Sequence, residues 1–89
     1  MKVSKDFIMR EIAGEYILVP VGAAAAKFNG LITMNELGQF IFNLLSEDCT
    51  IVQLAEKITA EYDVSLETAA SDAQAFLQQL REVGALEEA

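Results

Sequence analysis

The sequence predicts an α+β domain in which three N-terminal strands are followed by three helices. Two observations lead to this fold class. The first third is rich in β-branched and aromatic residues broken by glycine and the single proline, whereas apolar residues after Asn35 recur at helical spacing. A length of 89 residues suits one domain, so we expect residues 1–89 to share a single core.

The expected strands come first along the chain. Phe7 to Ile12 mixes β-forming residues with charge, and Tyr16 to Val19 is a continuous apolar run. Ala13-Gly14 lies between them and predicts a tight turn, hence a hairpin. Pro20 cannot donate a ladder hydrogen bond and therefore marks a strand end or an edge. The short apolar run from Leu31 to Met34 predicts the third strand.

The first two helices have recognisable start signals. Asn35 is a suitable N-cap for a helix over residues 36–45, whose apolar residues lie three and four apart. Thr50 and Gln53 have the spacing of a capping box, in which each side chain accepts a hydrogen bond from the other residue's backbone amide. A second helix is therefore expected from Ile51 onward.

The third helix is expected to begin after Ser65 as N-cap and to end at Gly84, a residue that readily adopts the left-handed C′ conformation. Its predicted apolar stripe consists of Leu66, Ala69, Ala73, Phe76, Leu77, Leu80 and Val83. In the first helix, Gly38 costs about 1 kcal/mol relative to alanine, which predicts close approach of another group at this position.

Charge, hydropathy and cysteine content indicate which partners and which compartment this chain is expected to have. The chain has 14 acidic and 6 basic residues, a net charge of −8 that repels phosphate backbones and anionic lipid. We therefore expect neither nucleic acid nor a membrane as a partner. The longest apolar run, Tyr16 to Ala26, is shorter than the roughly 18 residues of a membrane span. Cys49 is the only cysteine and cannot form an internal disulfide, so a cytoplasmic protein is expected.

The residues of catalysis and metal binding are largely missing. Histidine, the commonest general base and a frequent metal ligand, is absent. The pairs Glu61 with Asp63 and Glu67 with Asp72 lie at predicted helix ends and polar faces, which favours a solvated surface. The glycines have no phosphate-loop or dinucleotide-binding spacing. We expect no enzyme, no cofactor and no metal ion, and therefore binding by shape.

A free strand edge is the feature through which such a domain could bind. A small sheet exposes its edges, and an unpaired edge is a template for an incoming extended peptide. The run from Leu31 to Met34 is the candidate because it is short and apolar and leads directly into the first helix. From these residues alone, a position inside the sheet is an equal alternative.

Several segments in order resemble the PqqD-like family. They are IAGEYILVPVG, FNGLITMNELGQFIFNLL and DAQAFLQQLREVGAL, and the resemblance spans residues 3–87. It implies a winged helix-turn-helix-like fold and a role as recognition element for ribosomally made, post-translationally modified peptides. The implied partners are a precursor leader peptide and a peptide-modifying enzyme, with a radical SAM enzyme as one candidate. The connector VGAAAAKFNG is more similar to the broader PqqD-like group than to the quinone-pathway protein, which favours a different product.

The resemblance also implies where the leader binds, as an added strand in the groove between the third strand and the third helix. The implied peptide-binding residues are Leu31, Ile32, Thr33, Met34, Asp72, Phe76, Gln79 and Leu80. Phe76 and Leu80 also belong to the apolar stripe, so packing against the sheet is an equal interpretation for them. Asp72 and Gln79 lie at the border of that stripe.

A winged-helix DNA-binding transcriptional regulator is the alternative function, because its order of elements is compatible with this sequence. The third helix would then contact DNA. It offers Arg81 as its only base, against the carboxylates of Glu67, Asp72 and Glu82. This charge balance favours peptide binding over DNA binding.

Overall fold

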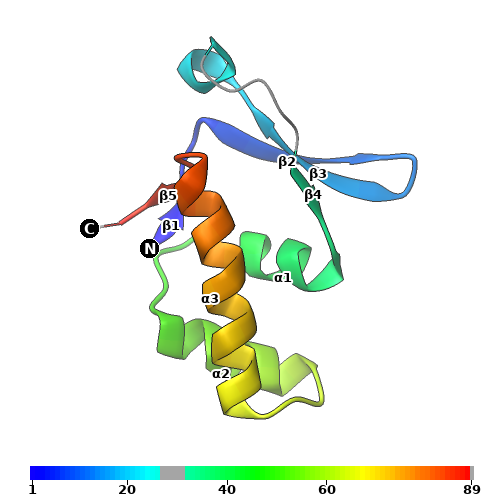
Figure 1. Ribbon diagram of the computed structural model, residues 1–89, viewed down its shortest axis with the longest axis vertical. Coiled ribbons are helices and arrows are strands. Elements are labelled where there is room, and N and C mark those ends of the chain that lie inside the picture. The colour runs from blue at the N-terminus through cyan, green and yellow to red at the C-terminus, as the bar shows by residue number, and fades with distance from the viewer. Residues whose placement is uncertain (27–31, 89) are drawn as a thin grey trace.

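The computed structural model describes residues 1–26 and 32–88 (Figure 1). The elements are β1 (Lys2–Val3), β2 (Phe7–Ile12), β3 (Glu15–Pro20), the 3₁₀ helix η1 (Gly22–Ala26), β4 (Ile32–Met34), α1 (Glu36–Leu44), α2 (Ile51–Glu61), α3 (Leu66–Glu82) and β5 (Leu86–Glu87). The predicted hairpin, the strand before α1 and the three helices are confirmed. Residues 27–31 lie outside the described part of the chain, and they include Leu31, the first residue of the predicted third strand.

The main sheet is antiparallel, with the strand order β2-β3-β4. Ala13 and Gly14 connect β2 to β3 with φ angles of 52° and 83°, as a hairpin turn of two left-handed residues requires. On the other side of β3, Tyr16 pairs with Met34 and Leu18 with Ile32. Because β3 is central, β4 forms one edge of this sheet, and β3 is its only strand partner among the described residues.

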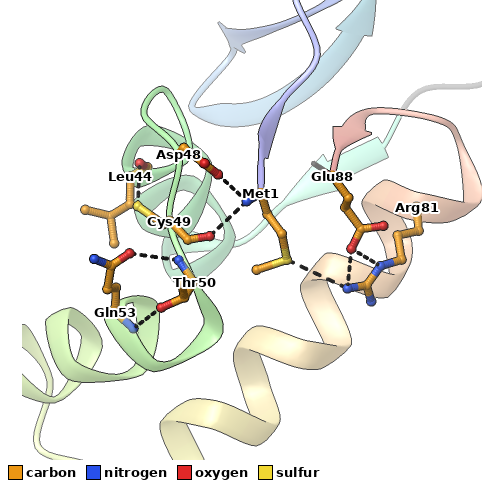
Figure 2. Close-up of polar contacts among 8 residues, drawn as sticks. All are labelled: Met1, Leu44, Asp48, Cys49, Thr50, Gln53, Arg81 and Glu88. Carbon is orange, nitrogen blue, oxygen red and sulfur yellow. Dashed lines mark hydrogen bonds and ion pairs between the residues drawn. The ribbon is translucent and has the colours of Figure 1, made fainter.

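The two ends of the chain form a second, two-stranded antiparallel sheet in which Val3 pairs with Leu86. Figure 2 shows the Met1 ammonium donating to the Asp48 carboxylate and, at 3.1 Å, to the Cys49 carbonyl. These contacts tie the N-terminal strand to the loop between α1 and α2. The sequence did not predict this sheet, because strands of two residues contain no periodic pattern.

The helix starts have the predicted caps. The side-chain oxygen of Asn35 accepts a hydrogen bond from the Gly38 amide at 2.7 Å. In the capping box, the Thr50 amide donates to Gln53 Oε1 at 2.9 Å and the Gln53 amide to Thr50 Oγ1 at 3.1 Å (Figure 2). Ser65 accepts from the Thr68 amide at 3.1 Å. These bonds satisfy amides that have no partner within a helix.

The end of α3 is a Schellman motif centred on Gly84, which has a φ of 74°. The Ala85 amide donates to the Leu80 carbonyl at 2.8 Å, and the Gly84 amide to the Arg81 carbonyl at 3.1 Å. The predicted glycine C′ position is thereby confirmed. The motif turns the chain so that β5 can pair with β1.

One core joins the sheet and the helices. Its fully buried large side chains come from β3, α1, α2 and α3 and from the residue after α1: Leu18, Ile41, Leu45, Leu54, Ile58, Leu77 and Leu80. Leu66 is 55% exposed, so its assignment to the core was wrong. The other predicted stripe residues are in the core except Val83, which is only partly buried against it: the buried ones are Ala69, Ala73, Phe76, Leu77 and Leu80. Leu66 is the first residue of the helix, next to the turn that leaves α2. None of the described helices is long and apolar enough to cross a membrane.

Candidate functional site

A groove of ≈ 550 Å³ lies between the edge strand β4, the start of α1 and the middle of α3. In Figure 1, β4 leads directly into α1, and α3 crosses beside it. The groove is lined by Thr33, Met34, Asn35, Leu37, Gly38, Ile41, Asp72, Ala75, Phe76 and Gln79. Its size is within the range of pockets that hold small ligands or side chains.

The floor of the groove is apolar and firmly packed. Met34 is 4% exposed and Phe76 is 8% exposed, so each presents only a small part of its surface, and Ile41 is fully buried behind them. Gly38 lies directly beside the phenyl ring, because a Cβ built on it would be 3.0 Å from Phe76 Cε1. The close approach predicted at Gly38 is therefore confirmed.

The rim of the groove is polar and exposed. Asp72, Ala75 and Gln79 are solvent-accessible and follow one face of α3, at spacings of three and four residues. Thr33 is exposed on the opposite wall, in β4. An extended peptide in the groove would thus meet a carboxylate and an amide on α3, with an apolar floor between α3 and β4.

The edge of β4 supplies main-chain hydrogen-bonding groups. In an antiparallel strand the amide and carbonyl of successive residues point alternately toward one neighbour and toward the other side. Since β3 is the only described strand that pairs with β4, the outward set belongs either to Thr33 or to Ile32 and Met34. Either set can pair with another extended chain.

The structure brings most of the sequence-predicted residues together. Thr33, Met34, Asp72, Phe76 and Gln79 line the groove. Ile32 belongs to the same strand but does not line the groove, and Leu31 lies outside the described residues. Leu80 is 0% exposed and lies in the core, which supports the packing interpretation of this residue.

Several lining residues were not singled out from the sequence. Ala75 lies three residues after Asp72 and four before Gln79, so helical spacing could have identified it. Leu37 and Ile41 lie on α1, and no signal in the sequence places α1 against the groove rather than the sheet. Only the fold brings them to Asp72 and Phe76.

A second cleft, of ≈ 570 Å³, lies at the end of β4 near the hairpin turn. It shares Thr33, Met34 and Asn35 with the first groove and adds the carboxylates of Glu15 and Glu36. Glu36 also lies near Tyr62, the residue that follows α2. Burial of the Tyr62 phenol raises the pKa of Tyr62, and the Glu36 and Glu61 carboxylates raise this pKa further. The lining of this second cleft is acidic, because Glu15 and Glu36 are the only charged residues among the described residues that line it.

Cys49 lies in the segment between α1 and α2 and is buried. Its Sγ donates to the Leu44 carbonyl at 3.4 Å (Figure 2). Within residues 1–26 and 32–88, no group of three or more His, Cys, Asp or Glu side chains is arranged to hold a metal ion.

The one basic residue of α3 is engaged within the chain. Arg81 pairs with the Glu88 carboxylate, with Nε at 3.1 Å and Nη2 at 2.9 Å from the same oxygen (Figure 2). A helix that binds DNA needs cations for phosphates and base edges. No observation in the described structure favours that role for α3.

A sheet edge beside a groove with an apolar floor is typical of domains that bind an extended peptide by strand addition. The family model for coenzyme PQQ synthesis protein D (PqqD) matches residues 15–86, so this chain belongs to the PqqD family. The family resemblance and the α+β fold class inferred from the sequence are thereby confirmed.

One solved structure is similar over the whole chain. It is TbiB1 in complex with the TbiA(beta) leader peptide, with a TM-score of 0.77 and 26% sequence identity. The alignment covers 100% of this chain and 98% of that chain. No curated protein sequence matches this chain.

Proposed function

We propose that this domain captures the leader segment of a ribosomally made precursor peptide by strand addition and presents it to a peptide-modifying enzyme. The observation that carries the proposal is the outer edge of β4, which pairs with no strand within residues 1–26 and 32–88 and lies beside a groove with an apolar floor. Membership of the PqqD family supports it. The similarity to TbiB1, whose structure contains a leader peptide, supports it further.

In this proposal the leader adds a strand to the sheet. Its backbone pairs with Leu31 to Met34, and every second side chain turns toward the groove because strand side chains alternate between faces. Thr33 and Met34 line the β4 side of the groove, and Asp72, Phe76 and Gln79 line the α3 side. Leu80 makes no direct contact with the leader in this proposal; it is buried in the core and holds α3 in position.

Two kinds of interaction supply affinity. Each main-chain hydrogen bond contributes about 0.5–1.5 kcal/mol net and is independent of sequence. An apolar leader side chain buried against Phe76 and Met34 contributes about 1.5–3 kcal/mol, which is about 10- to 100-fold in affinity. Specificity for one leader therefore depends on the groove, whereas the strand edge sets orientation.

The domain binds in this scheme and carries out no chemical step. The partner enzyme supplies the chemistry, and a radical SAM enzyme is the candidate that we put forward. The leader stays fixed on the domain while the core of the precursor peptide extends into the enzyme. A domain of this kind raises the local concentration of substrate, an effect that depends on how the two sites are linked in space.

The proposal is tested with a candidate precursor peptide, chosen from the short open reading frames that neighbour the gene for this chain. Its synthetic leader is titrated into the domain by calorimetry, and the full precursor is incubated with the domain alone and followed by mass spectrometry. We expect dissociation constants in the micromolar range or tighter and an unchanged precursor mass. A leader that fails to bind at 1 mM contradicts peptide capture; a mass change by the purified domain contradicts the purely binding role.

A further inference from the structure

Gly38 occupies an unusual position in the groove, because it is a buried glycine inside a helix and lies against the groove floor. A Cβ built there would lie 3.0 Å from Phe76 Cε1, 3.2 Å from Asn35 Oδ1 and 3.4 Å from Met34 Cβ. Phe76 and Met34 both line the groove. The missing side chain therefore allows the phenyl ring to lie flush against α1.

This close contact affects the depth of the groove. Phe76 is 8% exposed and is otherwise surrounded by the core, so the open groove is the side on which its ring has room to move. A methyl group at residue 38 would push the ring by a few tenths of an ångström. Packed interiors resist such shifts, and the displaced ring would make the groove shallower.

We propose that Gly38 is the residue that determines the size of the peptide side chain accepted by the groove. With glycine at this position, the groove selects an extended peptide carrying one bulky apolar side chain, aliphatic or aromatic, that seats between β4 and Phe76. This inference rests on the proposed peptide binding at the same site and goes beyond it by naming the residue that sets the size of the accepted side chain.

The probe is a phage-displayed library of random 12-residue peptides, selected on the wild-type domain. The expected winners share one bulky apolar anchor, and replacing that anchor by alanine in the synthetic peptide weakens binding about 10- to 100-fold. Enriched peptides without such an anchor overturn the present inference alone. A selection that enriches no peptide contradicts the proposed function itself.

Gly38→Ala tests the role of the glycine. Fluorescence anisotropy should show that peptides with a phenylalanine or tryptophan anchor bind at least about fivefold more weakly, while a valine anchor is less affected. The double variant Gly38→Ala/Phe76→Leu should restore the preference, because leucine lacks the Cε1 atom that the new methyl group meets. Equal weakening of all peptides, or no restoration in the double variant, overturns the proposal.

Two further variants keep the test decisive. Gln74→Ala lies on α3 outside the groove and should change no affinity ratio. Phe76→Leu alone deepens the groove and should raise the affinity ratio of tryptophan to leucine anchors, even if Gly38→Ala does not fold. If the affinity ratio of tryptophan to leucine anchors stays constant in Phe76→Leu, the floor does not determine the size of the accepted side chain and the proposal is overturned. Circular dichroism confirms the fold of each variant.

Discussion

Filling the groove from α3 should abolish peptide binding without loss of the fold. Ala75 is suited to this perturbation because it is exposed and lies between Asp72 and Gln79 along the groove face of α3. Tryptophan at this position would project over the apolar floor formed by Phe76. The side chain would then occupy the space that a leader side chain needs.

The expected magnitude follows from the contacts that are lost. An aromatic side chain covers about 150–250 Å² of surface, enough to cover the accessible floor of a groove of ≈ 550 Å³. A leader excluded from the floor loses at least one buried apolar side chain, about 1.5–3 kcal/mol, or about 10- to 100-fold in affinity. Because Ala75 is exposed, the free energy of unfolding should change by only about 0.5 kcal/mol.

The assay compares Ala75→Trp with Gln74→Trp, a matched variant that introduces the same side chain on α3 outside the groove. Calorimetry measures leader affinity, and urea denaturation measures stability. Only Ala75→Trp should weaken binding. If Ala75→Trp binds the leader as tightly as the wild-type domain, or if both variants are equally impaired, the groove is not the binding site.

Three further predictions concern the scaffold of the site. Leu80→Ala should lower the free energy of unfolding by about 2–5 kcal/mol in urea denaturation, because Leu80 is 0% exposed in the core beneath the groove. Thr50→Ala should cost about 1 kcal/mol in the same assay through loss of the capping box. The hydrogen bond and charge of the Met1 ammonium lower the pKa of Asp48 below 3.8 in the folded state. This contribution to stability is present above pH 3.8 and is lost as pH falls through the folded-state pKa, so thermal melts of Asp48→Asn should show a weaker loss of stability in acid.

Local signals in the sequence were sufficient for the scaffold. Asn35, Thr50 and Ser65 are caps, and each begins a helix where the sequence predicted it. Ala13-Gly14 is the hairpin turn, and Gly84 ends α3. Such positions are determined by backbone geometry and by hydrogen bonds to residues nearby in the chain, so neighbouring residues identify them without knowledge of the fold.

The site could be predicted only in part, since its two walls are distant in the sequence. From the sequence, an edge position and an internal position of β4 were equal alternatives; the strand order of the described residues places β4 at an edge. Leu80 and Phe76 share the same helical stripe, yet Phe76 reaches the groove and Leu80 does not. This difference depends on the position of α1, which no periodicity specifies. The close contact at Gly38 could be predicted, because a glycine inside a helix is unfavourable unless tertiary packing requires the absence of a side chain.

The central claim is that β4 keeps main-chain groups free for a peptide strand, and amide hydrogen exchange with and without leader tests it most directly. The exchange of residues 31–34 should slow when the leader binds, while the amides of β2, at the other edge of the sheet, stay unchanged. Protection that appears on β2 instead, with unchanged exchange at Thr33 under saturating leader, would contradict this account.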